Sequence, residues 1–330
     1  MAKKVILDLD TGIDDTLALV YAIASPELEL IGVTGTYGNV LVDTGVRNAL
    51  AVLEMFGRPD VPVFAGPTHA STKDSFEVTE VSAFIHGQNG VGEIEIPDAA
   101  RRVEEKSAVD FLVESVREHG DELLIIPTGP STTVAAAIEA DPGFAENAHI
   151  IMMGGALVIP GNVSPVAEAN VSQDPEATDL LFRHAKDVTM IGLDVTLQTL
   201  LTYAETATWR ELGTVGGDFL ADSTDYYIKT YETNSPHLGG CGLHDPLAVG
   251  VAVDPSLVGL LHTNLKVLTE GELRGRVMAD ETRLNDPEKT AHVALTVDVE
   301  RFLGEFMERL TRAARQTATS ELGSRSSAGV

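Results

Sequence analysis

The chain has 330 residues, of which 44% are hydrophobic and 22% are charged. This composition is typical of a globular protein with a sizeable core, and it excludes a disordered chain, a collagen-like chain and a disulfide scaffold. The sequence contains 23 Lys and Arg against 50 Asp and Glu, which gives a formal net charge of −27. Because so acidic a surface repels phosphate backbones and anionic lipid headgroups, we expect neither nucleic acid nor a membrane as partner.

The cysteine content and the N-terminal residues indicate a reducing compartment. Cys241 is the only cysteine in the sequence, so it has no partner for an internal disulfide. Asp8 follows only three apolar residues, Val5 to Leu7, whereas a secretion signal needs an apolar stretch of about 7–15 residues. A membrane span needs about 20, and the sequence has no such stretch. We therefore expect a cytoplasmic protein.

Over the first 200 residues, the apolar pattern alternates between strands and helices. Strands are predicted at 5–9, 30–36, 61–65, 122–127, 149–153 and 188–193. Helices are predicted at 14–24, 43–56, 108–119, 131–140 (capped by Ser131) and 174–184, with an irregular stretch near 67–100. This alternation predicts an α/β fold, with an open, mostly parallel sheet flanked by helices on both faces.

Beyond residue 200 the pattern becomes mainly helical. Helices are predicted at 203–212, 218–233, 245–253 and 299–314, and additional β structure at 257–268 and around 275–297. Residues 315–330 are rich in Ser, Thr, Ala and Gly without periodicity, so we expect a disordered tail. Because no repeat or linker composition divides the rest, we predict a single domain over residues 1–314.

The first predicted strand ends in a segment with four carboxylates within eight residues, Asp8, Asp10, Asp14 and Asp15. In open parallel sheets, ligands bind at the carboxyl ends of the strands. Four like charges on one loop repel one another, so a cation is expected to hold them together. An exposed acidic loop is the simpler alternative, and helix capping accounts for Asp14 or Asp15, but not for Asp8 and Asp10 as well.

The residues around these carboxylates favour a hard cation. No Cys or His-x-His pair accompanies them, so calcium or magnesium is expected rather than zinc. Thr128, in Ile-Pro-Thr-Gly-Pro, follows another predicted strand and offers a main-chain carbonyl. Asp245, in Gly-Leu-His-Asp-Pro, offers a further carboxylate at a helix start, where an ordinary N-cap explains it equally well.

Several segments resemble the nucleoside hydrolase family. They are DLDTGIDDTLAL near the N-terminus, YGNV at 37–40, IPTGPST at 126–132, MMGGA at 152–156, GNVSPVAEANVSQDPEA at 161–177 and LHDPLAV at 243–249. The resemblance extends from about residue 3 to residue 312, with the motifs in the same order. It implies an open α/β domain, usually in a homodimer or homotetramer, that binds Ca2+ and hydrolyses the N-glycosidic bond of ribonucleosides.

Carried over by position, the resemblance implies that Asp10, Asp15, Asp245 and the carbonyl of Thr128 bind calcium. It also implies that Asp10 deprotonates the metal-bound water, which attacks an oxocarbenium-like ribosyl group. Asp8 is expected to orient its neighbours. The substrate-binding positions that match the family are Asp14, Asn39 near the water, Met153 in the pocket, Asn162, Glu168 and Asn170.

The base side of the site departs from the family pattern. Ala169 stands where family members often carry an aromatic residue. The candidates for contacting the leaving base are His86, Tyr227, Tyr231 and His244. A histidine titrates near neutrality and can donate a proton, and we assign this catalytic role to His244. Because no aromatic sandwich for a purine is evident, the sequence predicts that uridine is used at least as well as inosine, with adenosine poor.

One alternative is a haloacid dehalogenase-type phosphatase, whose Asp-x-Asp motif also follows a strand. Asp8 would then be the nucleophile and Asp10 the acid/base, with magnesium as the metal. The later segment Gly217-Asp218 to Asp222 has the matching spacing, but the preceding ELGTVG does not form an apolar strand. The acidic surface also disfavours a phosphate substrate, unless a local metal overrides it.

The other alternative is a non-catalytic protein that binds nucleosides or sugars. Such a protein needs the ribose-reading residues but no water-activating carboxylate. The presence of Asp10 together with the whole calcium set argues against it.

Overall fold

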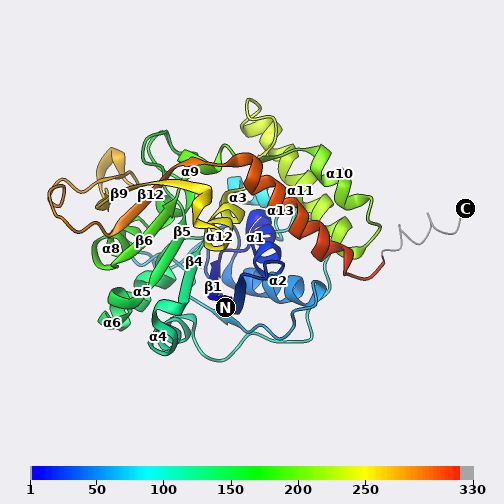
Figure 1. Cartoon of the computed structure of the whole chain (residues 1–330), viewed down its shortest axis with the longest axis horizontal. Coiled ribbons are helices and arrows are strands. Elements are labelled where there is room, and N and C mark those ends of the chain that lie inside the picture. Colours follow the sequence, from blue (N-terminus) through cyan, green and yellow to red (C-terminus); the bar gives the residue numbers. More distant parts are fainter. Residues whose placement is uncertain (1, 320–330) are drawn as a thin grey trace, which may run out of the picture.

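An eight-stranded sheet forms the centre of the computed structural model, which describes residues 2–319 (Figure 1). Its strand order is β3-β2-β1-β4-β5-β6-β12-β9, and every neighbouring pair is parallel except β12 and β9 at one edge. The strands are β1 (Lys3–Leu9), β2 (Leu28–Gly35), β3 (Val63–Ala65), β4 (Leu123–Pro127), β5 (His149–Met153), β6 (Asp187–Ile191), β9 (Val258–Thr263) and β12 (Ala291–Val297). The predicted α/β fold with a mostly parallel sheet is confirmed.

Helices cover both faces of the sheet (Figure 1). One face carries α1 (Ile13–Ile23), α2 (Val42–Met55), α10 (Tyr203–Arg210), α11 (Val215–Asn234), α12 (His244–Val253) and α13 (Val299–Arg315). The other carries α4 (Ala108–His119), α5 (Thr132–Ala140), α6 (Pro142–Asn147) and α8 (Pro175–His184). Within β1, Val5 and Leu7 pack into the first core and Ile6 into the second, which is why the strand is apolar throughout.

The strand order reverses between β1 and β4, which lie side by side at the middle of the sheet. The chain moves outward through β2 and β3 on one side and through β5 and β6 on the other. Loops on the two sides of such a switch point diverge and leave a crevice at the carboxyl ends of the strands. Asp8 lies at the end of β1, Asp10 directly follows this strand, and Asp14 and Asp15 lie in the first turn of α1, while Thr128 follows β4. Both predicted groups therefore meet at this crevice.

Several short elements differ from the sequence prediction. The stretch near 67–100 contains a helix, α3 (Glu80–His86), whose N-cap Thr79 accepts from the main-chain N–H of Ser82 at 3.0 Å. Ser131 occupies the N-cap of α5, but its side chain accepts no capping hydrogen bond, so its predicted capping role is wrong. Also missed are α7 (Ala169–Gln173), α9 (Leu193–Thr196) and the ribbon of β7 (Leu200–Leu201) and β8 (Cys241–Gly242). These elements are too short for apolar periodicity to reveal them.

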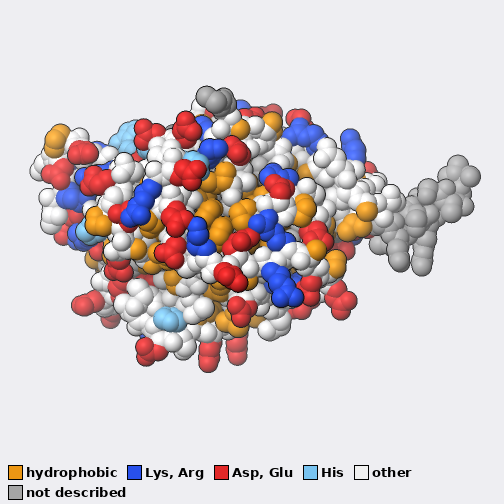
Figure 2. All heavy atoms as spheres, turned by 90° about the horizontal axis from the view of Figure 1, so that it is seen from below, with side chains coloured by type: hydrophobic (Ala, Val, Ile, Leu, Met, Phe, Trp, Pro, Cys, Tyr) orange, Lys and Arg blue, Asp and Glu red, His pale blue; other side chains and the backbone are white. Residues whose placement is uncertain are grey.

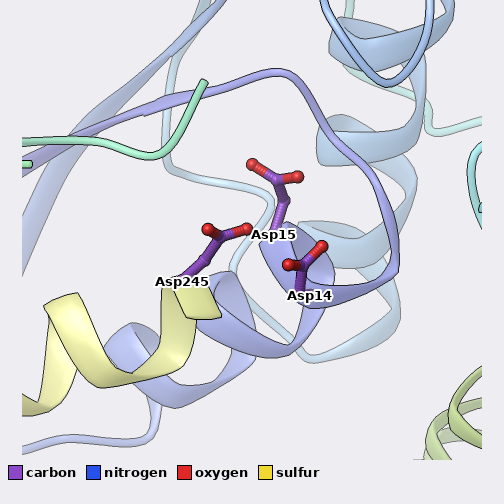
Figure 3. A group of neighbouring side chains, drawn as sticks. All are labelled: Asp14, Asp15 and Asp245. Carbon is purple, nitrogen blue, oxygen red and sulfur yellow. The ribbon is translucent and has the colours of Figure 1, made fainter. Parts of the chain in front are cut away.

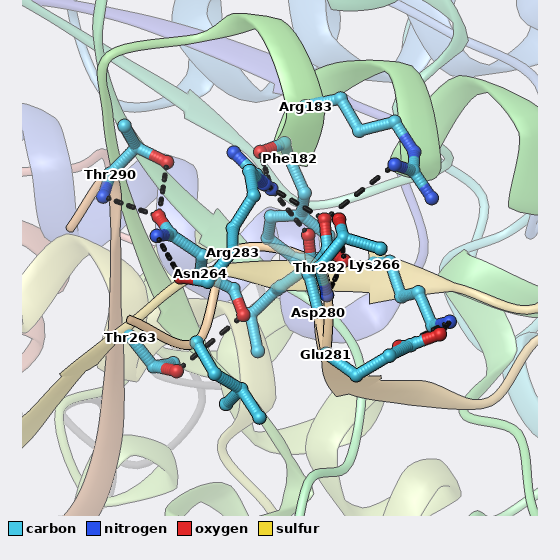
Figure 4. Close-up of polar contacts among 12 residues, drawn as sticks. Phe182, Arg183, Thr263, Asn264, Lys266, Asp280, Glu281, Thr282, Arg283 and Thr290 are labelled. Atoms are coloured by element: carbon cyan, nitrogen blue, oxygen red, sulfur yellow. Dashed lines mark hydrogen bonds and ion pairs between the residues drawn. The ribbon is translucent and has the colours of Figure 1, made fainter. Parts of the chain in front are cut away.

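The predicted β structure after residue 257 divides into the edge strand β9, strand β12 and a separate hairpin, β10 (Leu265–Val267) with β11 (Val277–Ala279). A polar cluster fastens this region to α8 (Figure 4). Asp280, 1% exposed, accepts from Nε of Arg283 at 2.8 Å and lies 3.6 Å from Arg183 of α8. Asn264 accepts from the main-chain N–H of Thr290 at 3.1 Å. Ion pairing of a buried carboxylate keeps the hairpin in place.

The C-terminal helix α13 packs Phe302, Phe306 and Leu310 into the core beside α1 and α11. It extends to Arg315, and the next residues pair with the start of α11: the main-chain N–H of Val215 donates to Ala318 at 2.8 Å. Of the predicted disordered tail, residues 320–330 lie outside the described residues.

Acidic side chains are spread over the face shown in Figure 2, with Lys and Arg between them. Across residues 2–319, the structure has no helix both long and apolar enough to span a membrane.

Candidate active site

A cavity of about 640 Å3 opens at the carboxyl ends of the central strands. Its walls come from the loops after β1, β2, β4 and β5 and from α3, α7, α11 and α12. The predicted site residues that line it are Asp14, Asn39, His86, Thr128, Met153, Asn162, Glu168, Asn170, Tyr227, Tyr231, His244 and Asp245. Asp10 and Asp15, both fully buried, are absent from the lining; their partners Asn39 and Thr128 line it instead. The fold therefore brings all the predicted positions to one place.

Three carboxylates converge at the floor of the cavity. Asp14 and Asp15 lie in the first turn of α1, and Asp245 in the first turn of α12. Each offers an oxygen atom, and these atoms all lie within 4.8 Å of one another (Figure 3). The two helices pack together, so their positive N-terminal ends face the same point and lower the cost of the clustered negative charge.

Asp10 is held by Asn39 from both sides. One carboxylate oxygen accepts from the main-chain N–H of Asn39 at 2.8 Å and the other from its side-chain Nδ2 at 3.1 Å. A Cβ at Gly38 would lie 2.0 Å from the Asp10 carboxylate, so only glycine allows this approach. Asp15 accepts from the main-chain N–H of Gly12 at 2.7 Å and from the hydroxyl of Thr128 at 2.7 Å.

Burial raises the pKa of every carboxyl group in this cluster. The pKa of Asp14 rises to about 7, because the group is desolvated and lies beside the charge of Asp15. The pKa values of Asp10 and Asp245 lie well above their usual range for the same two kinds of reason. Oδ1 of Asp14 is buried without a hydrogen-bond partner among the described residues.

The donor set at this point fits a hard cation. It consists of the carboxylate oxygens of Asp14, Asp15 and Asp245, and the described lining contains neither Cys nor Lys or Arg. Calcium prefers such oxygen ligands, and a bound cation would restore the ionised form of the carboxyl groups.

The loop after β5 and helix α7 form the next wall. Glu168 is the N-cap of α7, and its carboxylate accepts from the main-chain N–H groups of Gly155, Asn170 and Val171. Asn170 donates through Nδ2 to the carbonyl oxygen of Thr128 at 2.6 Å. Asn162 lies at the exposed rim and accepts from the main-chain N–H of Ala169 at 3.0 Å. Asn170 thus touches the carbonyl that the sequence assigns to the cation.

The opposite wall carries two buried histidines. The main-chain N–H of Ile13 donates to Nδ1 of His86 at 3.1 Å, so the ring proton of neutral His86 is on Nε2. His244 lies between the hydroxyls of Thr196 and Tyr231, each 2.7 Å from one ring nitrogen. Burial lowers the pKa of His86 to about 3, aided by His244, and that of His244 to about 4. Contrary to the sequence expectation of titration near neutrality, both rings are neutral at pH 7.

The sequence missed several residues that line the cavity. Thr79, Val81, Ser82 and Ile85 come from α3, and Gln173, Leu197, Asn234 and Ser235 come from α7, α11 and neighbouring loops. The N-cap sequence Thr-x-x-Ser at 79–82 was the one signal available for α3.

The segment that suggested a phosphatase lies elsewhere. Gly217 and Asp218 belong to the first turns of α11, and exposed Asp222 forms an ion pair with Arg210. None of these residues lines the cavity.

Comparisons with known proteins agree with this geometry. Residues 5–304 match the model of the family described as inosine-uridine preferring nucleoside hydrolase. The chain belongs to the nucleoside hydrolase family. Its members are enzymes that hydrolyse ribonucleosides, and both the family prediction and the prediction of an enzyme are confirmed.

Relatives cover nearly the whole length of the chain. Uridine nucleosidase 1 of Arabidopsis thaliana is 37% identical over 94% of this chain and 94% of its own. The inosine-uridine preferring nucleoside hydrolase of Crithidia fasciculata is 32% identical over 94% of this chain and 98% of its own. Among solved structures, the purine-preferring ribonucleoside hydrolase from Gardnerella vaginalis is 62% identical, with a TM-score of 0.94, covering 95% of this chain and 99% of that one.

Proposed function

We propose that this nucleoside hydrolase is calcium-dependent. The carboxylates after β1 and at the start of α12 would hold the ion and activate the attacking water. The observation that supports this most is the convergence of Asp14, Asp15 and Asp245 on one point below the cavity. Three desolvated carboxyl groups within reach of one ion are costly unless a cation neutralises them.

The proposed calcium ligands are Asp15 and Asp245 from this group, together with Asp10 and the carbonyl of Thr128. Asp10 lies beside Asp15, because Nδ2 of Asn39 donates to both carboxylates, at 3.1 and 3.3 Å. Asp14, the third member of the group, is assigned to the ribose. When bound, calcium supplies positive charge that lowers the pKa of a water molecule and fixes its position. Asp10 accepts the proton of the attacking water, and Asn39 holds both of its carboxylate oxygens in the orientation that this transfer needs. The new bond joins the water oxygen to C1′ of ribose, and the bond from C1′ to the base nitrogen breaks.

The proposed ribose site lies between the carboxylates and α7. Asp14 faces it with an oxygen that has no hydrogen-bond partner within residues 2–319, and Asn170, Glu168 and Asn162 supply further polar groups on the far side. Met153 lines the cavity between them. Since an unpaired buried polar group is costly, such a site rejects a sugar that lacks the matching hydroxyls.

The proposed leaving-group site is the wall with the histidines. His86 directs an Nε2–H donor from a ring held by the main chain, and Tyr227, Tyr231 and His244 add donors along α11 and α12. The departing base accepts a hydrogen bond from this wall, keeps the electron pair of the broken bond on its nitrogen and takes its proton from water.

For the base, we propose inosine ahead of uridine, with adenosine poor. This changes the order suggested by the sequence, which favoured uridine because Ala169 removes an aromatic wall. Two observations support inosine: the 62% identical relative is named as purine-preferring, and apolar Val81, Ile85 and Val163 line a cavity of about 640 Å3, within the range of drug-sized ligand sites.

Ribose release tests the activity and the base order together. Purified protein is incubated with inosine, uridine, cytidine or adenosine, and free ribose is measured as reducing sugar. We expect turnover with kcat/KM highest for inosine. Efficient turnover of adenosine alone would overturn the base order, and binding without ribose release would favour the non-catalytic alternative.

Exhaustive chelation tests the calcium proposal. Turnover should disappear after chelation and return with calcium, but not with zinc, because the ligand set contains only oxygens. Full activity in protein shown by elemental analysis to be metal-free would contradict it.

We further propose a homodimer or homotetramer in the cytoplasm. Light scattering of the purified protein would check the oligomeric state, and fractionation of the source cells would check the location.

A further inference from the structure

A buried hydroxyl lies behind His244, on the side away from the cavity. Thr196, the last residue of α9, has no exposed surface, and its Oγ1 lies 2.7 Å from Nδ1 of His244. The two residues come from segments that the β7–β8 ribbon joins, and the main-chain N–H of Leu243 donates to the carbonyl of Thr199 at 2.8 Å. Neither the cavity lining nor the family motifs quoted above include Thr196.

The hydrogen atoms of this pair can be assigned by counting donors and acceptors. In the hydrogen bonds found for residues 2–319, His244 is the one side-chain partner of Thr196 Oγ1. If Nδ1 of His244 carried the ring proton, the threonine hydrogen would be buried without an acceptor. If the threonine hydroxyl donates to Nδ1, its hydrogen is satisfied and the ring proton moves to Nε2.

The tautomer of His244 determines what Tyr231 can do. Nε2 of His244 lies 2.7 Å from the hydroxyl of Tyr231, which is 3.5 Å from the hydroxyl of Tyr227, and Tyr227 donates to Asp14 at 3.3 Å. With the proton on Nε2, His244 donates to Tyr231, and the hydroxyl hydrogen of Tyr231 is free to point toward Tyr227 or a bound base. In the other tautomer, Tyr231 must donate to His244 and offers the cavity no hydrogen.

We propose that Thr196 is a positioning residue that holds His244 with its proton on Nε2, so that donation runs from Thr196 through His244 to Tyr231 and the cavity. This proposal rests on the proposed leaving-group role of the histidine wall. His86 provides an independent parallel: there a main-chain N–H, which can only donate, fixes the same tautomer. Both rings would therefore carry their proton on Nε2. A main-chain N–H fixes this tautomer in His86, and the hydroxyl of Thr196 fixes it in His244.

Nitrogen NMR of the histidine rings tests the tautomer directly. Protein labelled with [15N]histidine is measured at pH 7, with resonances of His86 and His244 assigned by their loss in His86→Gln and His244→Gln. We expect both rings of the unsubstituted protein to show a protonated Nε2 and an unprotonated Nδ1. In Thr196→Val, which removes the hydroxyl at similar volume, His244 should change to the other tautomer or a mixture, whereas His86 should not.

Kinetics then separate positioning from folding. Thr196→Val should lower kcat for inosine about tenfold, the scale of one lost hydrogen bond, with little change in KM. It should leave unchanged a ribosyl substrate whose nitrophenolate leaving group needs no proton. Thr196→Ser keeps the hydroxyl and should retain the activity. Thr199→Val removes an equally buried hydroxyl whose hydrogen-bond partners in the described part of the chain are the main-chain carbonyls of Thr196 and Leu243. It should have no selective effect on inosine.

The outcomes distinguish this proposal from the proposed function. If the unsubstituted protein releases no ribose, the proposed function fails, and the NMR experiment still decides the tautomer. If it is active, but Thr196→Val keeps the Nε2–H tautomer or slows both substrates equally, the positioning role is wrong. Should Thr196→Val fail to fold, an Nδ1–H tautomer of His244 in the unsubstituted protein would still overturn the proposal.

Discussion

The two walls of the cavity are built in different ways. On the carboxylate side, Asp10 and Thr128 directly follow central strands, and Asp15 lies in the first turn of α1; these groups are held mainly by main-chain groups or by one another. On the histidine side, Tyr231 and His244 come from helices, and their contacts are mostly between side chains. The ends of β1 and β4 therefore fix Asp10 and Thr128 directly, whereas the groups proposed to contact the base depend on how the helices pack.

This difference agrees with the names of the relatives. Proteins named for uridine, for inosine and uridine, and for purines all align with more than nine-tenths of this chain. A wall formed by side chains on α3, α11 and α12 can change from one relative to another without disturbing the strands.

Burial also acts in opposite directions on the two sides, because it raises the pKa of carboxyl groups and lowers that of histidines.

The largest expected effect comes from the carboxylate wall. Asp10→Ala should lower kcat by at least about a hundredfold, the scale of losing a general base. Asp8→Asn is the matched control two residues earlier, because Asp8 accepts from the hydroxyl of Thr34 at 2.7 Å and is not among the proposed calcium ligands. Burial raises its pKa to about 7. Steady-state ribose release measures both variants, and normal turnover by Asp10→Ala would show that the assigned base is wrong.

On the histidine wall, His244→Ala should slow natural nucleosides by about a hundredfold and the nitrophenyl riboside far less. The difference arises because nitrophenolate is a stable anion, whereas a departing nucleobase needs the hydrogen bonds of this wall to stabilise its developing negative charge. Comparing kcat for inosine and the nitrophenyl riboside measures it. Equal losses on both substrates would remove His244 from the leaving-group role.

The ribose contact gives the next effect. Asn170→Ala should reduce kcat/KM by the equivalent of about 2 kcal/mol, as expected for a buried polar contact. Asn162→Ala, at the exposed rim of the same wall, should cost less because water replaces its hydrogen bond. The kcat/KM values of the two variants test this order. A larger loss for Asn162→Ala than for Asn170→Ala would show that the ribose does not lie beside Asn170.

The smallest expected effect is on the pH dependence of folding stability, which should have opposite signs for the histidine wall and the carboxylate wall. The folded-state pKa of His86, about 3, lies below its usual 6.5, so its stabilising contribution is complete above pH 6.5 and decreases as pH falls toward 3. At pH 5 the loss is about 2 kcal/mol. Chemical denaturation of His86→Gln at pH 7 and pH 5 should show that the variant loses less stability on acidification than the unsubstituted protein does.

Asp14→Asn should have the opposite effect in metal-free protein. The folded-state pKa of Asp14 is raised to about 7 from 3.8, so its contribution is complete below pH 3.8 and is lost as pH rises through 7. The variant should therefore lose less stability than the unsubstituted protein between pH 5 and pH 8. If Asp14→Asn reduced the loss of stability on acidification, as is expected of His86→Gln, and not the loss on a rise in pH, the electrostatic contrast between the walls would be refuted.

The sequence alone determined the sheet and the residues at its carboxyl end. Buried strands such as 149–153 are continuous apolar runs, and 108–119 has a clear helical period, so both were predicted with the bounds that the structure has. The aspartates at the end of β1 were found because helix capping explains Asp14 or Asp15 but not all four like charges beside a buried strand. The family motifs then led to residues, such as Asn162, that local pattern alone would not single out.

Only the tertiary structure decided which side chains contact each other and what proton state they adopt. Asp14 and Asp245 are 231 positions apart, and only the packing of α1 against α12 brings their oxygens together. Helix α3 is too short for its period to be recognised, and Thr196 has no motif because its partner lies 48 residues away. Burial, which sets the pKa values of His86 and His244, depends on what packs around a ring, and local sequence does not specify that.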